Sequence, residues 1–132
     1  MPISITNPST LHDPVGFGYS HVARVGSGEL MLIAGQYASD REGHVVSADF
    51  AEQVDQALAN LGAALESADL RYRDVAGLRT FVVDHDPGKL AVIAAAVRRI
   101  WGDQPPTQTL LGVAALALPD MRFEVDAIAV CS

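Results

Sequence analysis

Hydrophobic and polar residues recur with different periods along the chain, and these periods predict two helices and five strands. Apolar side chains return every three or four residues from Phe50 to Ala68, the spacing of one face of a helix. A second helical stretch begins at Asp86 and Pro87, where the missing N–H of an early proline does no harm, and continues to Trp101. Apolar or alternating runs predict strands at 20–25, 30–34, 74–84, 109–115 and 122–130.

The order of these elements predicts the fold class. A glycine-rich turn at 26–29 predicts that the first two strands pair as a hairpin, and the proline and glycine residues of 7–18 predict a loop. The resulting order is β-β-α-β-α-β-β. It is typical of one α+β domain, here spanning residues 1–132, with both helices on one face of a mixed sheet.

The predicted strands are more apolar than two helices can cover. Residues 30–34, 78–83 and 110–117 are apolar on both faces, whereas a strand with one face in water alternates. We therefore expect other copies of the chain to cover the second face, in a homo-oligomer with closed symmetry. A monomer with a hydrophobic patch is the alternative.

Composition narrows the classes of function. The 132 residues are 49% hydrophobic and 19% charged, which suits one folded domain. Sixteen acidic and nine basic residues give a net charge of −7, and Lys89 is the only lysine. A binder of nucleic acid or of an anionic membrane needs clustered basic residues, so neither partner is expected.

The single cysteine, Cys131, predicts no internal disulfide, and no cysteine or histidine cluster predicts a metal site. The N-terminus lacks the basic and apolar regions of a signal peptide. We therefore expect a cytoplasmic protein without a metal or another cofactor.

Candidate chemistry begins with two carboxylates on the last predicted strand. Glu124 and Asp126 are two residues apart, so their side chains share one face of the sheet. Because Phe123 and Val125 flank Glu124, its carboxylate is a candidate for a perturbed pKa. The alternative is a pair of charges that faces solvent.

Other candidates lie near turns and strand ends. His21 is two residues from Tyr19, and Thr109 lies at the start of a strand, just after a Pro-Pro break. Side chains at such strand ends often face clefts. No two of the four histidines have the spacing of metal ligands, and each is expected at the surface.

Several short motifs follow one another in a recognisable order. They are Gly18-Tyr19-Ser20, Ala34-Gly35-Gln36, Gln53 with Ala59-Asn60-Leu61, Pro106-Thr107-Gln108-Thr109, and Leu118-Pro119 with residues 123–129. Their order and spacing resemble the Rid family (YjgF/YER057c/UK114), which are reactive-intermediate imine and enamine deaminases. The resemblance covers about 19–130. It implies a chorismate-mutase-like fold and a homotrimer in which the sheets form a central barrel, with a ligand site in each cleft between subunits.

The resemblance also implies which residues form the site. Active members clamp the carboxylate of a 2-imino acid with an arginine, and a serine, a tyrosine and a glutamate complete the site. The tyrosine falls on Tyr19, and the glutamate, which orients the attacking water, falls on Glu124. The arginine falls on Gln108 and the serine falls on Ala34, beside Gly35, so both are absent from this chain.

The missing arginine lowers the expected activity on free 2-imino acids. Two lost charge-assisted hydrogen bonds cost about 3–6 kcal/mol, or roughly two to four decades in kcat/KM. Arg79 is the best substitute cation, ahead of Arg24 and Arg122, because it lies inside an apolar strand and needs a partner. The family's helical asparagine falls near Ile93 or Ala94, where nothing polar is available.

Two functions stay open. In the first, the chain is a cofactor-free hydrolase of altered specificity, in which Gln108 and Thr109 help to bind a neutral amide, lactam or keto group and Glu124 positions water. In the second, it is a non-catalytic trimer that binds a small molecule as a sensor or carrier. Endoribonuclease activity, an older label of the family, is a minor third, because three chains of charge −7 repel phosphates.

Overall fold

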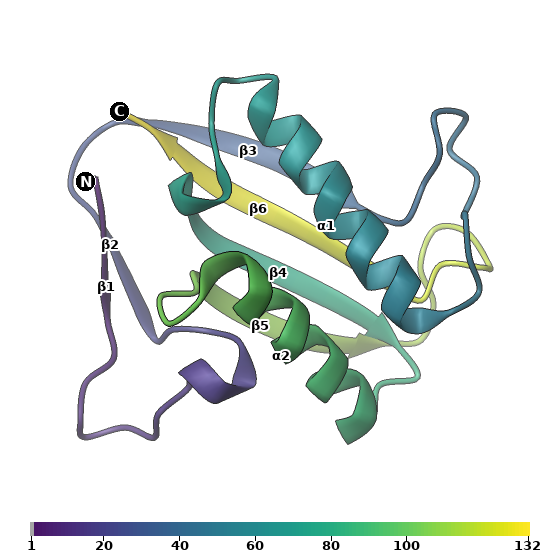
Figure 1. The fold of residues 1–132 in the computed structure, drawn as a ribbon, viewed down its shortest axis with the longest axis horizontal. Coiled ribbons are helices and arrows are strands. Elements are labelled where there is room, and N and C mark those ends of the chain that lie inside the picture. The colour runs from purple at the N-terminus through teal and green to yellow at the C-terminus, as the bar shows by residue number, and fades with distance from the viewer. Residues whose placement is uncertain (1) are drawn as a thin grey trace.

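A four-stranded mixed sheet forms the centre of the molecule, in a computed structural model that describes residues 2–132. Its strands are β3 (Glu29–Gln36), β4 (Val75–Val83), β5 (Thr107–Val113) and β6 (Phe123–Cys131), in the spatial order β3-β6-β4-β5. β6 is antiparallel to both of its neighbours, and β4 is parallel to β5 (Figure 1). The predicted mixed sheet is confirmed.

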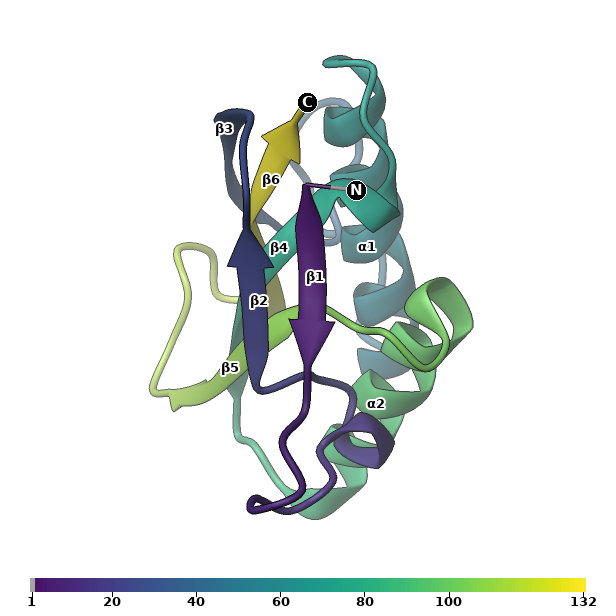
Figure 2. The ribbon, with the colours of Figure 1, turned by 90° about the vertical axis from the view of Figure 1, so that its left-hand side faces the viewer.

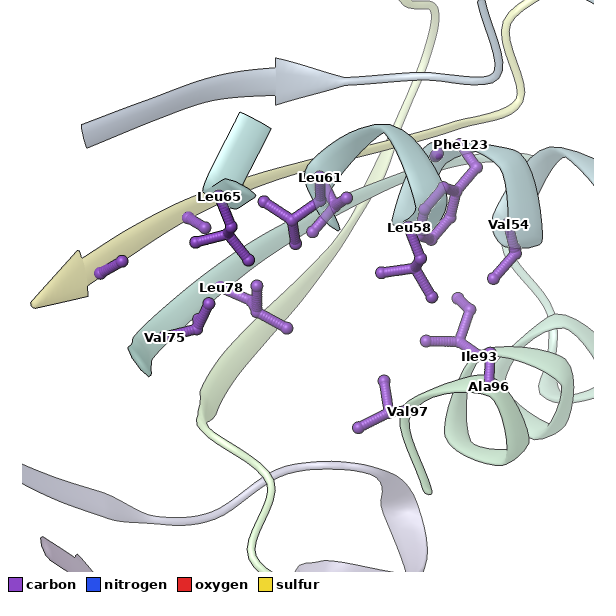
Figure 3. Packing of buried hydrophobic residues seen from close by; sticks show 14 of the residues in the cluster. Val54, Leu58, Leu61, Leu65, Val75, Leu78, Ile93, Ala96, Val97 and Phe123 are labelled. Atoms are coloured by element: carbon purple, nitrogen blue, oxygen red, sulfur yellow. The ribbon is translucent and has the colours of Figure 1, made fainter. Parts of the chain in front are cut away.

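Both helices cover the same face of this sheet, as predicted (Figure 2). α1 (Phe50–Glu66) begins after Asp49 and α2 (Pro87–Trp101) begins after Asp86, and each aspartate caps its helix by accepting a hydrogen bond from a backbone N–H of the first turn. The inward faces of the helices and sheet interlock in one core. Figure 3 shows its members, which include Val54, Leu58, Leu61, Leu65, Leu78, Ile93, Val97 and Phe123.

The opposite face of the sheet is bare and exposes several large apolar side chains. Four of its side chains are exposed: Leu32 at 78%, Leu30 at 60%, Ile128 at 45% and Leu111 at 40%. Within a single chain, residues 30–34 are therefore covered on one side only, and their covering by other copies stays a prediction. Met31 and Ile33 pack toward the helices, but α1 and α2 leave the other side of β3 uncovered.

The predicted hairpin between residues 20–25 and β3 is wrong. β2 (Val22–Val25) instead pairs antiparallel with β1 (Ile3–Thr6), with Ile3 opposite Val25, in a separate two-stranded sheet. No strand was predicted at β1, although its four residues alternate strictly between apolar and polar side chains. The loop predicted for 7–18 contains one short 3-10 helix, η1 (Val15–Phe17), and a second, η2 (Tyr72–Asp74), precedes β4.

Two polar side chains of α1 hold loops in place. Gln53 is fully buried; its amide nitrogen donates to the carbonyls of Ser47 and Asp120, at 2.8 and 2.9 Å, and its amide oxygen accepts from the N–H of Arg122 at 2.8 Å. Asn60 donates to backbone carbonyls in the segment after β3. Both motif residues therefore have structural partners within the fold.

In the described part of the chain, no helix combines the length and the hydropathy that crossing a membrane requires.

We expect Gln53→Leu to lower the free energy of unfolding by about 2 kcal/mol, because it leaves two carbonyls and one N–H without their partner. Chemical denaturation measures this loss. Gln56→Leu is the matched control, since Gln56 bonds only to the side chain of Asn60. Equal losses in both variants would contradict the role given to Gln53.

Candidate functional site

A pocket of about 470 Å³ lies between α2, β5 and the segment that precedes β2. Its size is within the range of small-molecule sites. Its wall is largely apolar and includes no Lys, Arg, Asp or Glu. The lining residues are His12, Phe17, Tyr19, Leu90, Ile93, Gln108, Thr109 and Leu110. Three of the predicted site residues, Tyr19, Gln108 and Thr109, therefore share one cavity.

The amide of Gln108 has hydrogen-bond partners at both ends. Its oxygen accepts from the hydroxyl of the fully buried Thr80 at 2.5 Å, and its nitrogen donates to the carbonyl of Gly18 at 2.8 Å. One N–H and one lone pair of the amide remain for a ligand. Gln108 therefore fixes the turn that precedes Tyr19 as well as lining the pocket.

Position 18 requires glycine for two independent reasons. Gly18 has a φ of +89°, which L side chains rarely adopt, and an added Cβ would lie 3.0 Å from the Cα of Ala94 in α2. The turn therefore packs closely against α2. This approach places Tyr19 over the pocket.

One residue of the pocket, His12, was not predicted from the sequence. Nε2 of His12 lies 2.6 Å from the hydroxyl oxygen of Tyr19, and Nε2 of His21 lies 2.8 Å from the carbonyl oxygen of His12. The ring centroids of Tyr19 and His21 are 5.5 Å apart. His12 carries no periodic or spacing signal, because it belongs to a loop whose path only the folded chain reveals.

Glu124 lies on the other face of the sheet. Thr80, whose hydroxyl donates to Gln108, points toward the helices. The next residue, Phe81, is the register partner of Glu124 on β6. Successive side chains of a strand alternate, so Glu124 and Gln108 point to opposite faces. Within one chain, the two do not line a common pocket.

The surroundings of Glu124 raise its pKa above the usual 4.5, first through partial burial and then through the negative charge of Asp126. The predicted shared face of the two carboxylates is confirmed. Gly35 lies directly against this side chain: a Cβ at position 35 would be 2.7 Å from both the carboxyl carbon and Oε2 of Glu124. A shift of register between Ile33 and Gln36 brings Gly35 to this place.

Arg79 has a partner on the same face. Its Nε and Nη2 donate to the carboxylate of Asp126, with a shortest distance of 2.6 Å, and its guanidinium carbon is 5.7 Å from the ring centre of Phe81. Both charged residues line a groove of about 720 Å³, which Ala34 and Thr109 also line. Asp126 therefore pairs with the positive charge of Arg79, the cation that was expected to substitute for the family's arginine. Neither Arg24 nor Arg122 lines this groove or the pocket.

The predicted site residues thus form two groups. Tyr19 and Gln108 belong to the pocket beside α2, and Gly35, Glu124 and Arg79 belong to the bare face with Ala34. Thr109 lines both cavities. Among the described residues, no three His, Cys, Asp or Glu side chains are close enough to hold a metal ion.

Comparison with known proteins shows which family this chain matches. The sequence model of the family described as Endoribonuclease L-PSP matches residues 12–131. A solved structure of YyfB from Yersinia pestis, a protein of unknown function of the conserved Rid family, is 39% identical with a TM-score of 0.94, over 99% of this chain and 100% of that one.

Two curated relatives are more distant. The RutC family protein YjgH from Escherichia coli is 32% identical over 108 residues, 81% of each chain. A 2-iminobutanoate/2-iminopropanoate deaminase from Salmonella typhimurium is 28% identical over 125 residues, 92% of this chain and 94% of that one. The matches agree with the fold class and the family resemblance drawn from the sequence.

Glu124→Gln is expected to stabilise the chain slightly at neutral pH. Because folding raises the pKa of Glu124, ionising it destabilises the native state; this cost is complete above the folded pKa and absent well below 4.5. The gain is a fraction of a kcal/mol, since solvent screens a half-buried group. It should vanish as the pH falls below 4.5.

Unfolding curves measured from pH 4 to pH 8 test this dependence. Glu42→Gln, in an exposed turn, is the control and should leave the pH profile unchanged. A gain for Glu124→Gln that grows as the pH falls would have the wrong sign and would refute the assignment.

Proposed function

This chain belongs to the Endoribonuclease L-PSP family, and from that premise we propose that it is a homotrimer with a small-molecule site between subunits. We propose further that this site hydrolyses imines or enamines that carry no free carboxylate. The observation that carries the proposal is the wall of the pocket beside α2. It combines apolar side chains with Tyr19, Gln108 and Thr109, and no lysine or arginine lines it.

The two-sided arrangement of the site residues supports a site made by two chains. Tyr19 and Gln108 lie beside α2, whereas Glu124 and Ala34 lie on the opposite, bare face. A second copy that packs on the bare face would bury Leu30 and Leu32 and would bring its own pocket toward Glu124. Closed symmetry would repeat this contact around the ring.

The pocket's chemistry supports selection against free 2-imino acids. A carboxylate that enters an apolar cavity loses hydration and, without a cation, gains no compensating charge. The remaining N–H and lone pair of Gln108 match a neutral amide, lactam or keto group instead. An imine carbon is already electrophilic, so attack by water needs no metal or cofactor.

Glu124 is proposed to hold the attacking water. Its raised pKa makes its carboxylate a stronger hydrogen-bond acceptor than that of an ordinary glutamate, which suits a group that holds and orients the water. Attack would give a carbinolamine, which expels ammonia and leaves a carbonyl product. In the Salmonella typhimurium relative, the named activity is that of a 2-iminobutanoate/2-iminopropanoate deaminase.

A binding protein without turnover is the second candidate. The observation that favours it is the engagement of Gln108 by Thr80 and Gly18, and of Arg79 by Asp126, since these polar groups serve the fold. Glu124→Gln separates the two candidates. A catalyst loses turnover in this variant, whereas a binder keeps its ligand affinity.

RNA cleavage receives no comparable support. Each chain carries a net charge of −7. Five of its nine basic residues form ion pairs with aspartates: Arg79 with Asp126, Lys89 with Asp86, Arg98 with Asp103, Arg99 with Asp55, and Arg122 with Asp84. Paired and scattered cations do not form the basic surface that phosphates require.

We expect no acceleration of 2-iminopropanoate hydrolysis by the wild-type protein. An amino-acid oxidase generates the imine in situ, and semicarbazide traps what survives. Because the pocket offers no cation to the carboxylate, trapping should proceed as it does without the protein. Clear acceleration would contradict the proposal and would direct attention to Arg79.

The reciprocal variant is Gln108→Arg, which should gain affinity for pyruvate measured by calorimetry. Gln108→Met is the matched control, because it removes the same hydrogen bonds to Thr80 and Gly18 without adding charge. A folded Gln108→Arg variant that binds pyruvate no better than Gln108→Met would show that position 108 does not select the substrate.

A substitution on the bare face of the sheet tests the proposed trimer interface. We expect the wild type to sediment as three chains of 14.0 kDa and Leu32→Glu to dissociate, because the substitution places a charge in an apolar contact. Val22→Glu is the control, since Val22 is also exposed but lies on the two-stranded sheet. A trimeric Leu32→Glu variant would refute an interface on this face.

A further inference from the structure

Two histidines and a tyrosine form a cluster at the mouth of the pocket. The ring centroid of His12 lies 4.8 Å from that of His21 and 6.2 Å from that of Tyr19, both with edge-to-face geometry. The side chain of Asn7 accepts from the backbone N–H of His21 at 2.7 Å and donates to the hydroxyl of Ser20 at 3.3 Å. These contacts fix the segment that carries the cluster.

Elementary hydrogen-bond chemistry assigns a direction to one of the bonds. A backbone carbonyl only accepts, so the bond between His21 and the carbonyl of His12 requires a proton on Nε2 of His21. The other bond joins Nε2 of His12 to the hydroxyl of Tyr19 at 2.6 Å, and its direction depends on which ring nitrogen of His12 carries the proton. A tyrosine hydroxyl can donate to a neutral imidazole nitrogen.

We propose that His12 is a positioning residue for Tyr19 and accepts its hydroxyl proton, so that the pair transfers protons in the pocket. This rests on the proposed imine hydrolysis and adds to it a residue and a route for the proton. His12 is exposed, so its imidazole also exchanges protons with solvent.

The proton balance of hydrolysis suits such a pair. As water adds to the imine carbon, Tyr19 takes a proton from that water while its own proton passes to Nε2 of His12. The electron pair of the C=N bond moves to nitrogen, Tyr19 gives a proton to that nitrogen, and the proton on Nε2 of His12 returns to the Tyr19 oxygen. When the carbinolamine collapses, the pair again takes a proton from oxygen and gives one to nitrogen, which leaves as ammonia. Imine and water become carbonyl and ammonia, with no other reactant.

Neither α2 nor β5 brings a titratable group into the pocket that could exchange a proton with His12 in place of Tyr19. The residues that α2 and β5 contribute to the pocket are Leu90, Ile93, Gln108, Thr109 and Leu110, none of which titrates. The titratable groups near His12 come from its own segment. They are Tyr19, His21 and Asp13, and the Asp13 carboxylate accepts from the N–H of Val15 at 3.0 Å.

The first test needs no substrate. Nitrogen-15 NMR of the imidazole rings at a pH where they are neutral should show Nε2 of His12 without a proton and Nε2 of His21 with one. In Tyr19→Phe, His12 should revert to the Nε2–H form that neutral histidine side chains ordinarily prefer. A proton on Nε2 of His12 in the wild type would overturn the proposal. His44, far from Tyr19 in the chain and beside Asp40, serves as the internal reference.

The second test measures turnover of an uncharged imine, released from benzylamine by a flavin amine oxidase and trapped with semicarbazide. His12→Gln keeps a hydrogen-bond acceptor but takes no proton, so kcat should fall at least tenfold while KM stays unchanged. The kcat of Tyr19→Phe should fall by a similar factor. The kcat of the double variant should fall no further, because the two residues act as a unit.

The outcomes separate the two ideas. Full activity in His12→Gln would reduce His12 to a structural contact and overturn the proton route. An inactive wild type would count against the proposed hydrolysis with this imine, whereas the tautomer of His12 would still decide whether it accepts the proton of Tyr19. His44→Gln controls for the loss of a histidine elsewhere and should keep wild-type kinetics.

Discussion

The side-chain amide of Gln108 is the interaction on which the rest of the pocket depends. It joins the buried hydroxyl of Thr80 to the carbonyl of Gly18, and so ties the segment before β2 to the central sheet. That segment carries Phe17 and Tyr19, which form one side of the cavity. Gln108 is therefore part of the framework that shapes the cavity as well as a neutral group in its wall.

The alternation of a strand imposes the second constraint. Gln108 and Glu124 lie on strands that share β4 as a neighbour, yet they point to opposite faces. No rotamer change brings them together in one chain. A site that uses both residues is necessarily composite, and the exposed leucines on the face of Glu124 favour contact with another apolar surface.

Local patterns in the sequence predicted much of the fold. The period of α1, the start of α2 at Asp86 and Pro87, and the shared face of Glu124 and Asp126 all depend on residues close together in the chain. The pairing of β2 with β1 was missed because the glycine-rich turn at 26–29 favoured a hairpin between β2 and β3 over pairing with the short alternating run of β1. The bonds of Gln108 to Thr80 and Gly18 join positions 28 and 90 residues apart. Such contacts follow from strand register and loop path, which neither composition nor spacing encodes.

Gly35 has a consequence for how relatives of this protein are compared. Its missing side chain leaves the space that the carboxylate of Glu124 occupies, so the orientation of that acid is set by a residue with no functional group at all. Two sequences with identical charged positions can therefore differ in the reach and the surroundings of the acid through a single methyl group. Assigning activity within such a group requires the shape of the backbone beside each ionisable residue as much as the list of those residues.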